Sequence, residues 1–148
     1  MSDVTNYILS KTSRIKAEPE EVKVPPGYQM FNSGGVEVEV AEFLYSLVRM
    51  LKPEKIIETG THLGISSTYM ACALQRNGKG KVTTFEVIPQ HLNSSTQLWK
   101  DVGVSDYVQG ILMPSLDAQF APGTKVDMLF LDSEPQFRFM SLLSFGTS

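Results

Sequence analysis

The chain has 148 residues, 42% of them apolar, which is enough to bury one core of ordinary single-domain size. Its 13 Lys and Arg stand against 16 Asp and Glu, for a formal net charge of -3. No basic run is long enough to follow a phosphate backbone, so we expect no nucleic-acid partner and favour a small molecule or a protein.

Cysteine usage and hydropathy bear on location. Cys72 is the single cysteine, which excludes an intramolecular disulfide framework. The first residues lack a basic start followed by an apolar run, and no stretch of about eighteen uncharged apolar residues occurs. We therefore expect a cytoplasmic protein that makes no membrane contact.

The chain divides at about residue 35. Residues 1–35 are polar and interrupted by Pro and Gly, so we expect an N-terminal arm with a short helix at residues 4–13 and a domain over residues 36–148. Apolar residues spaced three and four apart predict a helix from about residue 38 that ends near Lys52 and Pro53.

Beyond Pro53, strand and helix patterns alternate. Short β-branched runs predict strands at residues 55–58 and 81–86, each followed by a helix, at residues 66–75 and 89–102. Two further strands are expected at residues 107–111 and 126–132. This alternation predicts an α/β fold with a Rossmann-like, doubly wound parallel sheet.

A glycine-bearing loop follows the first predicted strand, where ligands bind in open parallel sheets. Gly60 and Gly64 allow a tight turn and close ligand approach, and Gly64 leads into a helix. His62 argues against a dinucleotide site, because its side chain would fill the space kept for a pyrophosphate. A P-loop is also disfavoured, since it would need Gly-Lys-Ser or Gly-Lys-Thr at the end of the loop. A turn that uses glycine for geometry alone stays open as an interpretation.

An acidic residue strengthens the ligand-binding interpretation. Glu86 ends the second predicted strand, just over twenty residues after Gly64. A carboxylate at this position can accept hydrogen bonds from both hydroxyls of an adenosine ribose. An exposed acid in a turn is the alternative.

Three motifs in this order carry a family resemblance: ETGTHLGISS at residues 58–67, FEVIP at residues 85–89 and VDMLFLD at residues 126–132. Together they resemble the first, second and fourth motifs of class I S-adenosylmethionine-dependent methyltransferases. The similarity is greatest to the O-methyltransferase-like branch, which includes the catechol and caffeoyl-CoA enzymes, and it covers residues 38–139.

The resemblance implies S-adenosyl-L-methionine as cofactor and a set of binding residues. In that family pattern Glu58 approaches the methionine amino group, while Gly60, Thr61 and Gly64 pass against the methionine and ribose. Ser66 or Ser67 would meet the carboxylate. Glu86 would hold the ribose hydroxyls, with Ile88 against the adenine, and Asp132 would face the sulfonium or the acceptor.

Methyl transfer from a sulfonium asks chiefly for positioning, and a base is needed only when the acceptor must lose a proton. His62 and Asp132 are the candidate catalytic bases. Metal-dependent relatives carry further Asp or Asn ligands, whereas Asp132 stands here before Ser133 and Glu134, so we expect no tightly bound metal.

The predicted elements stop after four strands, whereas the resembled family has seven. The C-terminal strands that shape the acceptor pocket are therefore missing, and the open edge of the fourth strand favours a truncated form or a homodimer in which a second copy covers it. The leading hypothesis is a methyltransferase acting on a small-molecule oxygen. The alternative is a non-catalytic S-adenosylmethionine-binding or assembly module, and a nucleotide-dependent oxidoreductase ranks third.

Overall fold

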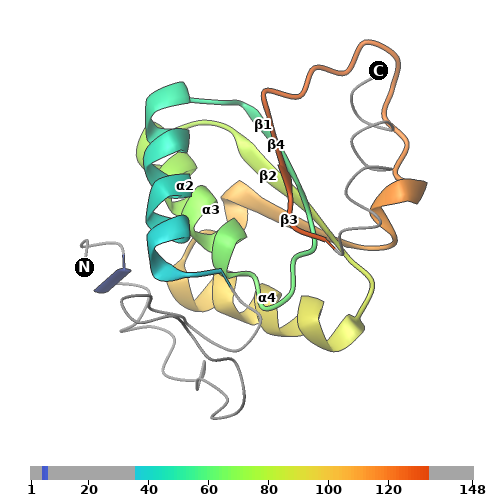
Figure 1. The fold of residues 1–148 in the computed structure, drawn as a ribbon, viewed down its shortest axis with the longest axis horizontal. Coiled ribbons are helices and arrows are strands. Elements are labelled where there is room, and N and C mark those ends of the chain that lie inside the picture. Colours follow the sequence, from blue (N-terminus) through green and yellow to red (C-terminus); the bar gives the residue numbers. More distant parts are fainter. Residues whose placement is uncertain (1–4, 7–35, 134–148) are drawn as a thin grey trace.

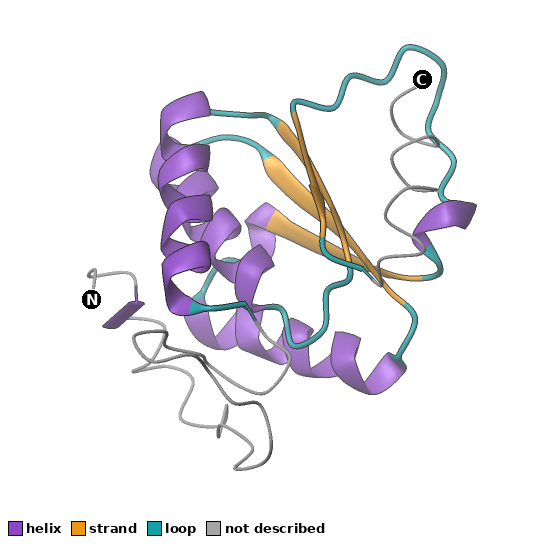
Figure 2. Cartoon of the chain, viewed as in Figure 1, coloured by secondary structure: helices purple, strands orange, loops and turns teal. Residues whose placement is uncertain are grey.

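A computed structural model describes residues 5–6 and 36–133, which form a four-stranded parallel sheet with helices packed on one face (Figures 1 and 2). The elements in chain order are α2 (Val38–Leu51), β1 (Lys55–Thr59), α3 (Ile65–Asn77), β2 (Lys81–Glu86), α4 (Pro89–Val102), β3 (Val108–Leu112) and β4 (Met128–Leu131). The predicted alternation of strands and helices is confirmed, and so is the Rossmann-like class of the fold.

The strands lie in the order β3-β2-β1-β4, and all pairs are parallel. The chain moves outward from β1 to β3 on one side and then returns to place β4 on the other side of β1. The order of the strands therefore reverses between β1 and β4. In parallel sheets, ligands bind beyond the carboxyl ends of the strands at such a reversal.

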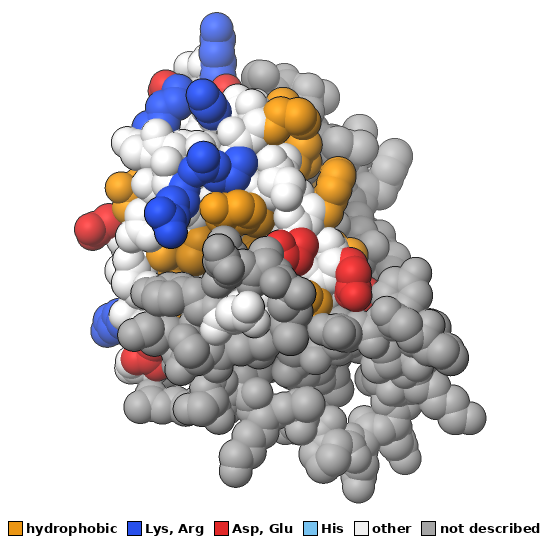
Figure 3. All heavy atoms as spheres, turned by 90° about the vertical axis from the view of Figure 1, so that its left-hand side faces the viewer, with side chains coloured by type: hydrophobic (Ala, Val, Ile, Leu, Met, Phe, Trp, Pro, Cys, Tyr) orange, Lys and Arg blue, Asp and Glu red, His pale blue; other side chains and the backbone are white. Residues whose placement is uncertain are grey.

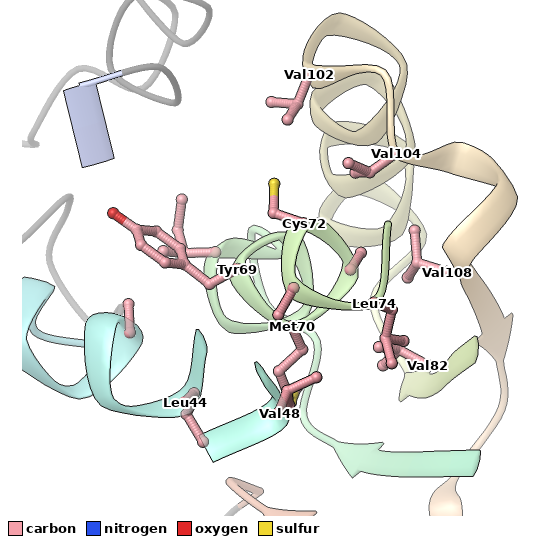
Figure 4. Packing of buried hydrophobic residues seen from close by; sticks show 14 of the residues in the cluster. Leu44, Val48, Tyr69, Met70, Cys72, Leu74, Val82, Val102, Val104 and Val108 are labelled. Atoms are coloured by element: carbon pink, nitrogen blue, oxygen red, sulfur yellow. The ribbon is translucent and has the colours of Figure 1, made fainter. Parts of the chain in front are cut away.

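The main core lies between the sheet and the three helices. On α3, Tyr69, Met70 and Leu74 are fully buried, and Figure 4 shows Met70 beside Val48 of α2 and Leu74 beside Val82 of β2. Because α3 is sandwiched in this way, the ten residues from its first position to Leu74 are all buried. The larger hydrophobic core therefore lies on the helix-covered face of the sheet.

The opposite face of the sheet is covered differently. Among the described residues, the buried hydrophobic side chains on this face are Ile57 and Phe85, and half-buried apolar side chains from residues 111–129 pack against them. Within the described residues this cover is a loop with one 3₁₀ turn, Ser115–Asp117, and no α-helix (Figure 2). This face is therefore less deeply buried than the first.

Gly110 determines how closely α4 approaches the sheet. A Cβ atom at this position on β3 would lie 2.3 Å from Leu92 Cδ1 and 3.0 Å from Trp99 Cη2, both on α4. Such distances are well inside van der Waals contact. The absence of a side chain at Gly110 therefore allows α4 to pack directly against β3.

Several boundaries differ from the predicted ones. Tyr107 belongs to a 3₁₀ turn (Ser105–Tyr107) rather than to β3, and β4 begins at Met128 because the Asp127 side chain accepts backbone N–H groups at the start of β1. Of the predicted arm only residues 5–6 are described. They are helical, and Thr5 is buried, where it contacts Glu42 and accepts a hydrogen bond from the Tyr69 hydroxyl.

Candidate cofactor site

The loop after β1 has the tight backbone that its glycines predicted. Gly60 (φ 85°) and Gly64 (φ 78°) both lie in the left-handed region, and a Cβ atom on Gly60 would come within 2.7 Å of the Asp132 carbonyl oxygen. A Cβ on Gly64 would come equally close to Ser95 on α4. The two glycines therefore let this loop pass between the end of β4 and α4.

His62 also has a left-handed backbone (φ 48°), which is uncommon for a residue with a side chain. Its backbone N–H donates to Glu86 Oε2 at 2.7 Å, and its carbonyl accepts from Ser95 Oγ at 2.8 Å. These bonds hold the loop against both β2 and α4. The conformation of His62 thus connects the glycine loop to the carboxylate that ends the next strand.

Glu58 is a buried carboxylate at the end of β1 and faces the helices. It is fully buried, and Ser66 Oγ donates to its Oε1 atom. Its Oε2 atom is also buried and has no hydrogen-bond partner among the described residues. Burial is the main cause that raises the pKa of Glu58 to about 7, and the charges of Asp132 and Glu86 add to it, while the Ser66 and Thr84 hydroxyls oppose the shift.

A buried, unpartnered carboxylate oxygen is costly unless a donor or a cation reaches it. Beside Ser66 lies a small cavity of about 20 Å³, also bounded by Gly60, Thr61, His62 and Asp132. A cavity of this size holds about one water-sized group. The arrangement suits a positively charged hydrogen-bond donor such as a ligand ammonium.

Glu86 lies at the end of β2, at the floor of a larger pocket of about 590 Å³. Its Oε1 atom accepts the backbone N–H groups of Val87 (2.8 Å) and Ile88 (3.0 Å), in addition to the His62 bond on Oε2. A carboxylate has about four acceptor positions, so capacity remains for a ligand hydroxyl. The pocket volume is in the range of small-molecule and cofactor sites.

Two histidines line this pocket together. The His62 and His91 rings meet edge to face with centroids 4.8 Å apart, and His91 Nδ1 lies 3.9 Å from Glu86 Oε1. Burial, and secondarily the charge of His91, lowers the pKa of His62, and Glu86 acts against this shift. His62 is therefore neutral at pH 7, where its ring can accept a proton.

The predicted site residues reach the two cavities to different degrees. Gly60, His62 and Asp132 line both cavities, Thr61 and Ser66 line the small one, and Glu86 and Ile88 line the large one. Glu58 borders neither cavity among the described residues, and it is joined to the small one through Ser66, whose hydroxyl donates to it. Gly64 and Ser67 border neither cavity among the described residues: Gly64 closes the turn, and Ser67 Oγ donates to its carbonyl at 3.1 Å.

Sequence reasoning missed several residues of the site. The large pocket is also lined by His91 and by a segment after β3, namely Met113, Pro114, Ser115 and Leu116. Thr84 was missed as well, and its hydroxyl shares a 2.6 Å hydrogen bond with Thr61. The signal for His91 was its place in the first turn of α4, two residues after Pro89.

No group of three or more His, Cys, Asp and Glu side chains is arranged to hold a metal ion in the part of the chain that the structure describes. Within the same residues, none of the helices combines the length and apolar character needed to cross a bilayer.

The fold and the site together define a Rossmann-like domain with a pocket that is lined by acidic residues at the carboxyl ends of its strands. A family model described as a methyltransferase domain matches residues 57–143, more than half of the chain. The chain therefore belongs to this family of methyltransferase domains.

Individual relatives agree with this assignment at low identity. A catechol O-methyltransferase of Mycobacterium tuberculosis is 26% identical over 102 residues, which cover 68% of this chain and 46% of the relative. The mouse (Mus musculus) catechol O-methyltransferase domain-containing protein 1 is 27% identical over 110 residues, which cover 74% of this chain and 41% of the relative. The chain spans about half the length of the curated relatives it matches.

Solved structures show the same fold. The Podospora anserina methyltransferase PaMTH1, bound to SAH, matches with a TM-score of 0.70 at 18% identity, covering 99% of this chain and 58% of that one. The O-methyltransferase TomG from Streptomyces achromogenes, in complex with SAM, matches with a TM-score of 0.63 at 22% identity. The match covers 97% of this chain and 60% of TomG.

Proposed function

We propose that this chain binds S-adenosyl-L-methionine and belongs to an enzyme that transfers its methyl group to an oxygen of a small-molecule acceptor. The observation that carries the proposal is the pair of carboxylates at the ends of β1 and β2. Glu58 has a buried oxygen that lacks a hydrogen-bond partner among the described residues, and Glu86 borders a pocket large enough for a nucleoside. The relatives named as catechol O-methyltransferases or as carrying that domain, and the SAM and SAH bound to two structural neighbours, support it.

The residues present fit the cofactor. Glu58 would receive the ammonium group of the methionine part, and the small cavity beside Ser66 gives that group room. Glu86 would accept hydrogen bonds from the ribose hydroxyls, held in place by the N–H groups of His62, Val87 and Ile88. Ile88, half exposed beside the pocket, would contact the adenine.

When bound, S-adenosylmethionine supplies a methyl carbon already activated by the sulfonium. The contribution of the chain is then to bind, to orient and to accept a proton. Asp132 borders both cavities and is a candidate base for the acceptor hydroxyl. His62, neutral at pH 7, is the second candidate base, and its backbone also positions Glu86.

The proposal also covers the location of the protein, the division of the chain and its assembly. The protein is cytoplasmic and binds neither membranes nor nucleic acid. Residues 1–35 form an arm and residues 36–148 form the cofactor-binding domain. Two copies of the chain pair through the edge of β4 that is open within the described residues, where β4 pairs with β1 alone. Sedimentation velocity tests the last statement, and a monomer at all concentrations would contradict it.

Titration calorimetry with S-adenosylmethionine tests the binding claim. We expect Glu86→Ala to weaken binding by about 10- to 100-fold, because it removes charged hydrogen bonds to the ribose. Glu54→Ala is the control, since Glu54 is an exposed acid paired with Lys79 at the opposite end of β1. Because Glu86 also holds backbone N–H groups, Glu86→Gln is measured in parallel, with circular dichroism to verify folding.

Methyl release to a panel of hydroxylated acceptors separates the enzyme from a non-catalytic binding module. Binding of S-adenosylmethionine with turnover of at least one acceptor supports the full proposal. Binding without any turnover across the panel favours the module, and unchanged affinity in Glu86→Ala contradicts the proposed site.

A further inference from the structure

His91 lines the large pocket and is not among the residues that the proposed function uses. It lies in the first turn of α4 and is half-buried, and its Nδ1 atom is 3.9 Å from Glu86 Oε1. Both side chains line the same pocket of about 590 Å³. This separation is too long for a direct hydrogen bond. The imidazole nitrogen is therefore adjacent to the carboxylate without being bonded to it.

Backbone groups already occupy most of the Glu86 carboxylate. Its Oε1 atom accepts the N–H groups of Val87 and Ile88, and its Oε2 atom accepts the N–H group of His62. A carboxylate has about four acceptor positions, so about one remains by this count. A ribose presents two neighbouring hydroxyl groups. We therefore expect Glu86 to satisfy one hydroxyl fully, and a second polar group beside it would stabilise the sugar.

The orientation of His91 is fixed by its neighbours. Its ring meets the His62 ring edge to face, with centroids 4.8 Å apart and an interplanar angle of 82°. The buried Ser95 Oγ lies 2.9 Å from the His91 carbonyl oxygen and 2.8 Å from the His62 carbonyl oxygen, so one hydroxyl connects both backbones. Because these contacts exist within the chain itself, a ligand that uses His91 loses little affinity to ordering it.

Other basic side chains lie elsewhere. Every Lys and Arg of residues 36–133 is at the carboxyl end of a helix or at or before the amino end of a strand, and none of them lines the large pocket. Figure 3 looks onto the side of α2 and shows most of the Lys and Arg there in its upper half, the end at which α2 stops and β1 starts in Figure 1. Within the described ranges, the basic side chains near Glu86 are thus the two histidines, and His91 is the one in ion-pair range.

We propose that His91 is a second ribose-binding residue, which bonds one hydroxyl of the nucleoside while Glu86 bonds the other. The inference rests on the proposed function, which assigns the ribose to Glu86. A neutral imidazole has one nitrogen that donates and one that accepts, so Nδ1 can be either partner of a hydroxyl. Because Nδ1 and Oε1 are 3.9 Å apart, neighbouring hydroxyls of one sugar can contact the imidazole and the carboxylate together.

The consequence is selection for ribose over deoxyribose. A sugar that lacks one hydroxyl leaves either Glu86 or His91 without its partner in the pocket. Loss of a partner from a polar group in a binding site costs affinity. His91 is in this sense a specificity-determining residue, since it recognises a hydroxyl that an apolar side chain at the same position would not distinguish.

Titration calorimetry with S-adenosylhomocysteine and with its 2′-deoxy and 3′-deoxy analogues tests this inference. His91→Phe keeps a ring against His62 and removes both ring nitrogens. We expect it to weaken S-adenosylhomocysteine binding by about 5- to 10-fold, the effect of one lost hydrogen bond. For one of the two deoxy analogues the same substitution should change the affinity little, because the hydroxyl that His91 would bond is already missing.

Two further variants control for structural effects. His91→Asn keeps a group that can donate or accept near the position of Nδ1, so it should bind S-adenosylhomocysteine within about threefold of the wild type. Gln90→Ala should leave all three affinities unchanged, because Gln90 is an exposed neighbour of His91 that lines neither cavity. Circular dichroism verifies that each variant folds.

The outcomes separate the inference from the proposed function. If S-adenosylhomocysteine does not bind the wild-type chain, the proposed function fails. If it binds and His91→Phe leaves its affinity unchanged, the proposed function stands and the role of His91 is refuted. Equal weakening of all three ligands by His91→Phe also refutes it, because His91 would then act through packing rather than through a hydroxyl.

Discussion

The two faces of the sheet differ in what covers them and in what they carry. The face toward α2, α3 and α4 holds the main core and, at the carboxyl ends of its strands, Glu58, Thr84 and Glu86. On the other face, the buried hydrophobic residues within the described ranges are Ile57 and Phe85, which a loop covers. Alternation of side chains along a strand thus places the apolar core and the polar ligand groups on the same face.

This difference shows where rigidity is needed. Glu58 is buried between β1 and α3, and Ser66 of α3 donates to it, so packing of α3 fixes the position of the carboxylate. The loop on the other face contributes Met113 to Leu116 to the pocket. The position of the carboxylates is thus set by helix packing, whereas this wall of the pocket is set by a loop.

The largest effect is expected from removing core volume on the helix-covered face. Leu74→Ala truncates a fully buried side chain and should lower the free energy of unfolding by about 2–5 kcal/mol. Leu129→Ala, half-buried on the other face, is the matched variant and should cost about 1 kcal/mol. Urea denaturation measures both, and equal losses would show that the two faces are equally buried.

The next effect concerns the buried acid of the helix-covered face. The folded-state pKa of Glu58, about 7, lies above its ordinary value of 4.5. Its contribution to stability is therefore fully present below about pH 4.5 and is lost as the pH rises through 7. Glu58→Gln should remove this loss, which is on the order of 3 kcal/mol at pH 8.

Thermal unfolding between about pH 5 and 8 measures this effect. The wild-type midpoint should fall across the range more steeply than that of Glu58→Gln. Parallel curves for the two proteins would mean that Glu58 is ionised in the folded protein without penalty.

A smaller effect is expected where Thr5 contacts the helices α2 and α3. Tyr69→Phe removes the hydroxyl that donates to Thr5 at 2.8 Å, and it should destabilise the protein by about 1 kcal/mol. Tyr45→Phe, on α2, loses a hydroxyl at a half-buried position and is the control. If the two variants unfold at the same urea concentration, the contact with Thr5 adds nothing to stability.

The smallest effect is expected at the rim of the sheet, away from either core. Asp127 accepts N–H groups of Glu54 and Lys55, both at 2.9 Å, and these bonds are the main cause that lowers its pKa. The stability that they supply is present at neutral pH and is lost as the pH falls through the depressed pKa. Asp127→Asn should therefore lower the thermal midpoint slightly at pH 7, and the difference should vanish in acid.

Sequence patterns were sufficient for the repeating units of the fold. The predicted second strand and the helix that follows it were confirmed at both ends, because Lys81 to Glu86 form a short run with β-branched residues and Pro89 marks a first helical turn. The predicted start of the third strand was wrong. Tyr107 has a side chain that is common in strands, but it lies in a 3₁₀ turn. Local propensity does not reveal where a chain turns to meet a neighbouring strand.

The site was predictable only where chemistry and topology coincide. Glu58, Gly60 and Glu86 lie at the ends of recognisable strands, so their meeting follows from the parallel sheet. The left-handed backbone of His62 and the unpartnered oxygen of Glu58 depend on contacts with β2 and α3. Such tertiary contacts leave no periodic signal, and the roles proposed for these residues stay predictions.

Gly110 has a consequence that reaches beyond packing. The glycine lets α4 approach β3, and the first turn of the same helix brings His91 to within 3.9 Å of Glu86. Gly110, which has no side chain, therefore influences the distance between His91 at the rim of the pocket and Glu86 at its floor. Variation at Gly110 would retune ligand fit through the tilt of a helix, while every residue in contact with the ligand stayed the same.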